Sequence, residues 1–237
     1  MIPILKKELN SFFSTPIGYL VIGVFLAMNG LFLWVFKGDF NILDAGFADL
    51  NNFFFIVPWF LLFLIPAITM RSFSDEIRLG TIEILKTKPI TDWQIVLGKY
   101  FGALVLIILA LIPTIIYAFS IHNLGGEIGS LDVGSTVGSY IGLLFLASTF
   151  TSIGLFTSTL SNNQIVAFIL AVIICFFMFY GFEAFAEFNL VDGIQNLGMK
   201  AHFNSISRGV IDTRDLVYFI STTVFFLFLT RFKLEQE

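Results

Sequence analysis

The chain has 237 residues, of which 57% are hydrophobic and only 13% are charged, and its mean hydropathy is +0.91. These values exclude an ordinary soluble globular protein. The formal net charge of −4 gives no support to nucleic-acid binding, which requires a basic surface, and the single cysteine excludes an internal disulfide or a cysteine-based metal site.

The chain begins with a predicted short helix that lies in the membrane interface. Apolar residues recur there at helical spacing, and charged residues stand between them. The apolar positions are Ile2, Leu5, Leu9 and Phe12. Pro16 is expected to end this helix.

Six apolar segments follow, and each is predicted to cross the membrane as a helix, because about 20 apolar residues span the hydrocarbon core. We therefore expect an all-α polytopic membrane protein with a single transmembrane domain over residues 1–237. The predicted spans are Ile17–Phe36, Phe53–Met70, Phe101–Ile121, Tyr140–Leu160, Gln164–Phe182 and Asp215–Thr230.

The last predicted span is short, with about 15 uncharged residues that would cover roughly 23 Å. Asp215 or Arg231 is therefore expected to reach outward from its ends. Within other spans, Pro58, Pro66 and Pro113 are expected to produce bends.

The distribution of lysine and arginine predicts the orientation of the chain. With a cytoplasmic amino terminus, nine basic residues fall on the inner side and four on the outer side. The inner ones are Lys6, Lys7, Arg71, Arg78, Lys86, Lys88, Lys99, Arg231 and Lys233. Both termini are therefore predicted to be cytoplasmic.

The segment between the second and third spans is unusually charged, with seven charged residues among positions 71–89. Phe73, Ile77, Ile84 and Leu85 are expected to share one side of a helix. One interpretation is a solvated connector that anchors two spans. A connector, however, needs only a few residues. The length and pattern favour a docking element for a soluble partner.

The long outer segment from Glu183 to Asp212 is neither fully polar nor fully apolar. Its aromatic and aliphatic residues predict short amphipathic helices that rest at the outer interface or dip into it. These residues are Phe185, Phe188, Leu190, Ile194 and Leu197.

The sequence lacks the motifs of common catalytic and transport mechanisms. No GxxxxGK[ST] phosphate loop occurs, so the chain is not expected to bind and split ATP by itself. His122 and His202 stand far apart without HExxH or cysteine neighbours, and we expect surface histidines rather than a zinc site. The spans are almost free of charge, which argues against an ion-coupled carrier.

Small residues recur at helix-packing spacing, at Gly98 and Gly102 and again from Gly134 through Gly138 to Gly142. Such patterns allow two helices to approach closely. They indicate either packing within one chain or part of a subunit interface.

The segment MRSFSDEIRLGTIEILKTKPITDWQIVLGKYFG resembles the region between the second and third spans of ABC-2 type transporter permeases. The family pattern has an acidic pair, Gly-Thr, Glu-x-Leu, Thr-x-Pro-Ile and Gly-Lys in this order. More narrowly, IPILKKELNSFFSTPIGYLV and HFNSISRGVIDTRDLVYF are similar to the permease subunit associated with bacterial gliding motility.

The resemblance implies a coupling helix that contacts a separate cytoplasmic ABC ATPase, with two ATPase copies in the complex. The residues carried over to this contact are Arg71, Asp75, Glu76, Arg78, Gly80, Thr81 and Glu83. ATP and magnesium would bind the partner, and no cofactor is expected in this chain. The subfamily also implies a second membrane subunit with a large extracytoplasmic region, with a homodimer as the alternative.

We therefore expect a non-catalytic permease subunit of an ATP-driven exporter in the bacterial inner membrane. The alternative is a structural or force-transducing subunit of a cell-surface motility or secretion machine that moves no substrate itself. The sequence does not identify the substrate.

Overall fold

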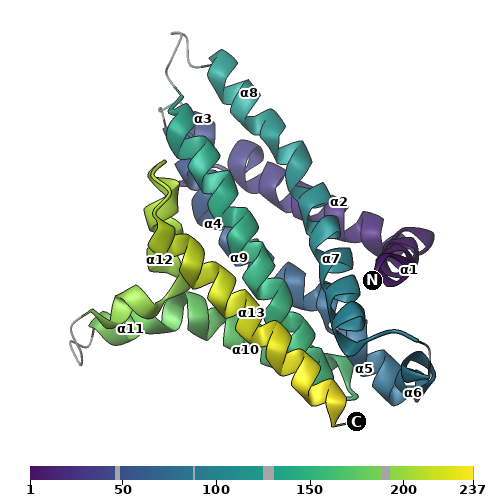
Figure 1. Cartoon of the computed structure of the whole chain (residues 1–237). Coiled ribbons are helices and arrows are strands. Elements are labelled where there is room, and N and C mark those ends of the chain that lie inside the picture. The colour runs from purple at the N-terminus through teal and green to yellow at the C-terminus, as the bar shows by residue number, and fades with distance from the viewer. Residues whose placement is uncertain (46–48, 88, 125–130, 188–192, 237) are drawn as a thin grey trace.

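A computed structural model describes residues 1–45, 49–87, 89–124, 131–187 and 193–236 (Figure 1). All regular structure in these ranges is helical, and six helices are long and apolar enough to cross a membrane. The predicted all-α polytopic fold is confirmed. The six spans are Pro16–Val35, Asn51–Arg78, Asp92–Leu124, Val133–Thr159, Gln164–Ala186 and Thr213–Glu235.

The elements of the first half of the chain are α1 (Ile2–Ser14), α2 (Pro16–Gly30), η1 (Leu31–Val35), α3 (Ile42–Ala45), α4 (Asn51–Thr69), α5 (Arg71–Arg78) and α6 (Thr81–Lys86). Those of the second half are α7 (Asp92–Leu111), η2 (Ile112–Thr114), α8 (Ile115–Leu124), α9 (Val133–Thr159), α10 (Gln164–Phe176), η3 (Phe177–Gly181), α11 (Phe182–Glu187), η4 (Ile194–Leu197), α12 (Met199–Ser207) and α13 (Thr213–Glu235). η1 and η3 are π-helical, while η2 and η4 are 3₁₀ turns.

The central helix of the bundle is α9, which packs against α4, α7, α10, α12 and α13. Its small and hydroxyl residues allow this close packing. A Cβ atom added at Gly154 would lie 2.0 Å from Thr69 Oγ1, so α4 and α9 are almost in backbone contact there. The hydroxyl groups bond to carbonyls of their own helix, as Thr151 does to Ala147 at 2.7 Å.

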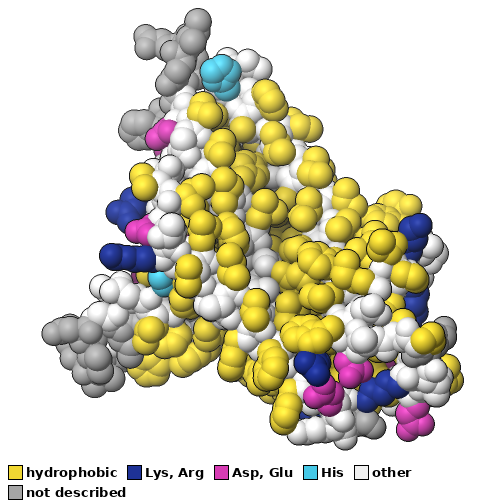
Figure 2. Space-filling model, in the orientation of Figure 1, with side chains coloured by type: hydrophobic (Ala, Val, Ile, Leu, Met, Phe, Trp, Pro, Cys, Tyr) yellow, Lys and Arg dark blue, Asp and Glu magenta, His cyan; other side chains and the backbone are white. Residues whose placement is uncertain are grey.

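The surface divides into two charged ends and an apolar band between them. Figure 2 shows charged side chains gathered over α5 and α6 at one end and beside α12 at the other. Spans 1 and 5 contribute to the band, because only 28% and 22% of their apolar windows are buried. A bilayer would cover such a band, and the two charged ends would lie outside it.

Several spans begin earlier than their apolar stretches predict, because polar residues cap the helices. Span 3 begins at Asp92 rather than Phe101, since Thr91 and Gln94 form a reciprocal capping box. α9 and α13 each begin after an aspartate whose side chain accepts a backbone hydrogen bond. Hydropathy detects the apolar centre of a span and not its polar first turns.

The prediction of a short last span is wrong, and of the two residues expected to reach outward, Asp215 or Arg231, Asp215 does not. α13 is 23 residues long, and Asp215 is only 4% exposed. Its carboxylate is paired with His202 of α12, which is therefore not the surface histidine that the sequence indicated. A partly buried partner, His202, stabilises this aspartate inside the structure.

The prolines and the outer segment follow the predictions in part. Pro58 and Pro66 lie within an unbroken α4, whereas Pro113 falls in the 3₁₀ turn between α7 and α8. The outer segment forms α11, η4 and α12, as the amphipathic pattern predicts. Phe188 and Leu190 lie outside the described residues.

Candidate functional site

The charged segment between spans 2 and 3 forms α5 and α6, which lie together at one end of the bundle (Figure 1). α5 continues α4 through Met70, which has helical backbone angles, so the second span extends beyond its apolar part as far as Arg78. Gly80 has a φ of +66°, a left-handed conformation that glycine adopts at little cost. The chain therefore turns at Gly80 and begins α6 at Thr81.

The buried face of this segment differs from the predicted pattern in one place. Phe73 is fully buried, and Ile77 and Leu85 pack partly against the same cluster, as predicted. Ile84 is instead 63% exposed, and Ile82 is buried in its place. The left-handed turn between α5 and α6 resets the helical repeat, so one continuous helical pattern does not hold through the segment.

A buried lysine at the start of span 3, Lys99, joins α5 to α1. Its Nζ atom lies 3.1 Å from Glu8 Oε1 and 3.0 Å from Glu76 Oε2. The same atom donates a hydrogen bond of 2.6 Å to the carbonyl of Ser72, and the Lys99 side chain is 2% exposed. We refer to Lys7, Glu8, Glu76 and Lys99 as the Lys99 cluster.

The charges of the Lys99 cluster balance, because two ammonium groups face two carboxylates. Lys7 Nζ donates to Glu76 Oε1 at 2.9 Å. Glu76 Oε2 accepts no hydrogen bond from the described residues, and its contact with Lys99 is an ion pair. Burial alone would lower the pKa of Lys7, but the hydrogen bond to Glu76 and the charges of Glu76 and Glu8 raise it above the ordinary 10.5.

Two glycines bring α1 close enough to α7 to form this cluster. A Cβ atom at Gly98 would lie 2.8 Å from Ile4 Cβ, and one at Gly102 would lie 2.8 Å from Glu8 Cβ. On α1, Ile4 and Phe12 are buried, whereas Ile2 of the predicted apolar face is exposed. The Gly98–Gly102 pattern therefore serves packing within the chain, which decides between the two alternatives left by the sequence.

Asp75, the other member of the acidic pair, is engaged inside the chain as well. Its Oδ1 atom accepts hydrogen bonds from Arg78, at 2.7 Å, and from the side-chain amide of Gln164. Gln164 is the first residue of α10, so Asp75 ties α5 to span 5. Neither carboxylate of the pair is free of partners within the chain.

Arg71 lies on the side of α5 that faces α1. It is partly buried, and its guanidinium carbon is 5.7 Å from the centroid of the Phe12 ring. This cation–π contact holds α1 against α5.

The exposed part of the segment is the turn between the two helices. Leu79 is 68% exposed and precedes Gly80, and Ile84 is 63% exposed, so two apolar side chains are exposed in this charged segment. We call the exposed residues of this turn the coupling tip: Arg78, Leu79, Gly80, Thr81, Glu83 and Ile84. The sequence prediction did not name Leu79 and assigned Ile84 to the apolar side of the helix, although two aliphatic residues around a glycine in a charged stretch are a detectable signal.

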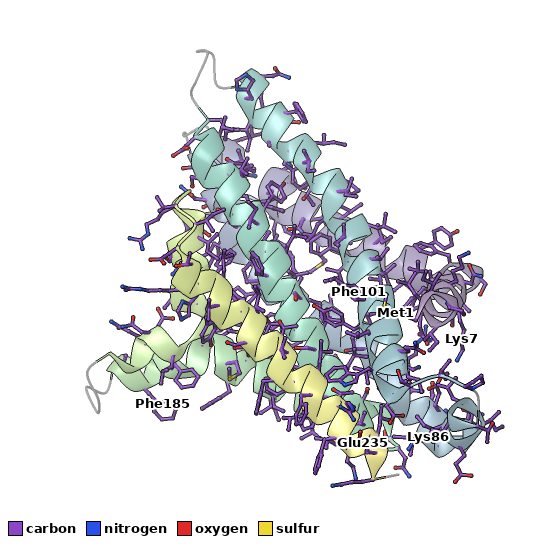
Figure 3. All side chains as sticks on the ribbon, viewed as in Figure 1. Met1, Lys7, Lys86, Phe101, Phe185 and Glu235 are labelled. Atoms are coloured by element: carbon purple, nitrogen blue, oxygen red, sulfur yellow. The ribbon has the colours of Figure 1, made fainter. Side chains whose placement is uncertain are left out.

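α6 is also attached to the end of the last span. Lys86 Nζ donates a hydrogen bond to the carbonyl of Leu234, and Figure 3 shows Lys86 beside Glu235 at the end of α13. Nearby, Arg231 lies 5.4 Å from the Trp93 ring centroid. A displacement of the coupling tip would therefore act on α13 as well as on α1, α7 and α10.

Among the described residues, no group of three or more His, Cys, Asp or Glu side chains could hold a metal ion. The site consists of an exposed tip and a set of internal ion pairs and hydrogen bonds that attach it to spans 2, 3, 5 and 6.

Comparison with known proteins supplies the family. A search of curated proteins finds no match. A family model described as "ABC-2 family transporter protein" matches residues 37–230, which is most of the chain and includes the whole α5–α6 segment. Members of this family are membrane components of transporters that work with an ABC ATPase. The chain is therefore a multi-pass membrane protein that belongs to the ABC-2 transporter family.

Proposed function

We propose that this chain is the permease subunit of an ATP-driven exporter, and that a separate cytoplasmic ABC ATPase binds the coupling tip. The observation that carries the proposal is the position of Leu79 and Ile84. These aliphatic side chains are exposed within a charged segment, between Arg78 on one side and Lys86 on the other. An apolar centre with a charged rim is typical of a protein–protein contact.

The seven residues carried over from the family divide into two roles in this proposal. Arg78, Gly80, Thr81 and Glu83 contact the ATPase, because they are exposed at the tip. The remaining three, Arg71, Asp75 and Glu76, hold the tip against α1, α7 and α10. ATP and magnesium belong to the partner chain.

We further propose that both termini are cytoplasmic and that the chain lies in a bacterial inner membrane. The excess of basic residues on one side supports this orientation. The contacts Lys7–Glu76 and Lys86–Leu234 support it too, since they place both ends of the chain beside α5 and α6.

The complex proposed here contains two ATPase copies and a second membrane subunit with a large extracytoplasmic region, or a second copy of this chain. The gliding-motility group is proposed on the opening IPILKKELNSFFSTPIGYLV and on HFNSISRGVIDTRDLVYF near the carboxyl end. These are resemblances of sequence, and purification of the native complex would identify the partners.

Substitution at the coupling tip tests the docking proposal. Leu79→Asp places a carboxylate in the apolar centre of the contact, and we expect loss of co-purification with the ATPase by at least tenfold. Val210→Asp is the matched control, because Val210 is 70% exposed at the opposite end. Full assembly and full ATPase activity with Leu79→Asp would contradict the proposal.

Reversal of charge at Asp75 and Glu76 is a poorer test, because it would also break the internal pairs with Gln164 and Lys99. A second measurement distinguishes an exporter from a force-transducing subunit. We expect a lipid or soluble substrate to raise the ATPase rate of the reconstituted complex, whereas a purely structural subunit would show no such response.

A further inference from the structure

A second group of buried polar side chains lies at the α12–α13 end, opposite to α5 and α6. His202 Nδ1 of α12 is 2.6 Å from Asp215 Oδ1 of α13, and the two side chains are 17% and 6% exposed. His202 Nε2 is 2.9 Å from the carbonyl oxygen of Asn196 in η4. Three elements therefore meet at one imidazole ring.

The two contacts can both be hydrogen bonds only if each of them contains a proton. A carbonyl oxygen only accepts, so His202 Nε2 must carry a hydrogen to bond Asn196. A second proton must then lie between Nδ1 and Asp215 Oδ1, because two lone pairs would repel at 2.6 Å. Both hydrogen bonds together thus require one proton more than a neutral histidine beside a carboxylate carries.

Loss of this proton would break one of the two hydrogen bonds. A neutral ring has a single N–H group, which can face either Asp215 or Asn196. The bond to a buried carboxylate is the stronger of the two, since it is charge-assisted. The contact that is lost is therefore the one from Nε2 to the Asn196 carbonyl, which releases η4.

Among the side chains that the structure describes, no other charged group replaces the proton. Asp215 Oδ2 is buried and accepts no hydrogen bond from the described residues. α9 and η4, which pack against α12, carry no charged residue, and η3 contributes Tyr180, whose ring lies 5.0 Å from Lys200 Nζ. The charged groups at this end are otherwise engaged or exposed: Lys200 with Glu183, Asp132 and Asp212 as helix caps, and Arg208 and Arg214 toward solvent.

Tyr218 holds the same turn by a bond that does not depend on this proton. Its ring stacks on the His202 ring with centroids 4.0 Å apart, and its hydroxyl donates to the Leu197 carbonyl at 2.6 Å. The turn η4 is therefore fixed at two adjacent carbonyls, of which one depends on a histidine proton.

We propose that His202 and Asp215 form a proton-binding site that locks η4 onto α12 and α13. The His202 ring is partly accessible to solvent, so protons can reach and leave it. A low pH at this side of the membrane closes the lock, and a high pH opens it. The position of the outer segment before the last span thus responds to the pH outside the bilayer.

The test is hydrogen–deuterium exchange of the full chain in lipid nanodiscs between pH 5 and 9, corrected for the intrinsic pH dependence of exchange. The reporters are the amides of Asn196 and Gly198, which bond within the turn. We expect their protection to fall about fivefold as the pH rises, as the loss of one hydrogen bond implies.

Asp215→Asn is the decisive variant. Its amide can donate to Nδ1 of a neutral ring, while Nε2 still donates to Asn196, so protection should become independent of pH. His202→Gln removes the titrating ring and should also give a flat profile, which keeps the test valid if one variant fails to fold. Tyr218→Phe is the matched control, since it should lower protection at every pH and leave the pH dependence in place.

Two results would overturn the proposal. One is a flat profile in the unmodified chain. The other is a pH dependence in Asp215→Asn or His202→Gln that equals that of the unmodified chain.

Discussion

The two ends of the molecule both bury a carboxylate beside a cation, but they use different cations. At the α5–α6 end, two lysines, Lys99 and Lys7, face two glutamates, Glu8 and Glu76. At the α12–α13 end, the partner of Asp215 is a histidine, whose ring nitrogens can gain or lose a proton. The comparison teaches that a carboxylate can be held inside the fold in two ways. Lysines hold it in the Lys99 cluster, whereas the proposed His202–Asp215 contact depends on a proton.

Removal of the Lys99 ammonium group should cause the largest loss of stability. Lys99→Met leaves Glu8 and Glu76 with Lys7 as the one remaining ammonium of the cluster. We expect the free energy of unfolding to fall by about 3–5 kcal/mol, because an uncompensated charge stays buried. SDS titration of the protein in mixed micelles measures this change.

Two further variants sharpen that measurement. Lys6→Met removes an exposed lysine of α1 and should have little effect. Glu8→Gln in the Lys99→Met background should recover part of the loss, because it removes one unpaired carboxylate. A loss for Lys99→Met no larger than that for Lys6→Met would show that the cluster does not hold the segment.

Separation of α12 from α9 should weaken the other end by a smaller amount. A Cβ atom at Gly138 would lie 2.5 Å from the Ile206 carbonyl oxygen and 3.0 Å from Gly209 Cα, both backbone atoms that cannot move alone. Gly138→Ala should therefore cost about 1–3 kcal/mol. It should also raise amide exchange in α12 without affecting α5.

Gly23→Ala is the control for this substitution, because no atom lies within 4 Å of the added Cβ. There the alanine should stabilise span 1 by about 0.5–1 kcal/mol through its higher helix propensity. Equal effects of the two alanines would mean that α9 and α12 are not in close contact.

The smallest expected effect concerns Lys7 at alkaline pH. Its pKa is raised in the folded chain, so its contribution to stability is complete below the ordinary 10.5 and is lost as the pH rises through the folded value. The contribution is below about 1 kcal/mol, because the side chain is 58% exposed. Lys7→Arg keeps its charge at higher pH.

We therefore expect thermal unfolding of the unmodified chain to lose stability above pH 10.5 relative to Lys7→Arg. The difference between the two proteins removes the titration of all other groups. The Lys7–Glu76 pair is without influence on stability if the two midpoints stay equal over this range.

The architecture was predictable from sequence because hydropathy reports directly on burial in lipid. All six spans lie where apolar stretches predict them. The misplaced starts have one cause, which is that Thr91, Asp132 and Asp212 cap helices outside the apolar part. Capping is a local signal: the sequence Thr91–Gln94 (TDWQ) has the pattern of a capping box and marks the start of span 3.

For the candidate site, only its place in the sequence was predictable. The length and charge of residues 71–89 indicated a docking element. The inward direction of Asp75 and Glu76, however, depends on Gln164 and Lys99, which are distant in sequence. Similarly, the pairing of His202 with Asp215 depends on how α12 folds back against α13. No periodicity within one segment predicts which partner another segment brings.

The continuous helix from Asn51 to Arg78 has a mechanical consequence. At 1.5 Å per residue its 28 residues form a lever about 42 Å long, and a tilt of about 5° at the tip would carry its far end by about 4 Å. If the proposed ATPase contact at Leu79 exists, a small rotation of α5 there would move the opposite end of span 2 by about the distance between two packed side chains.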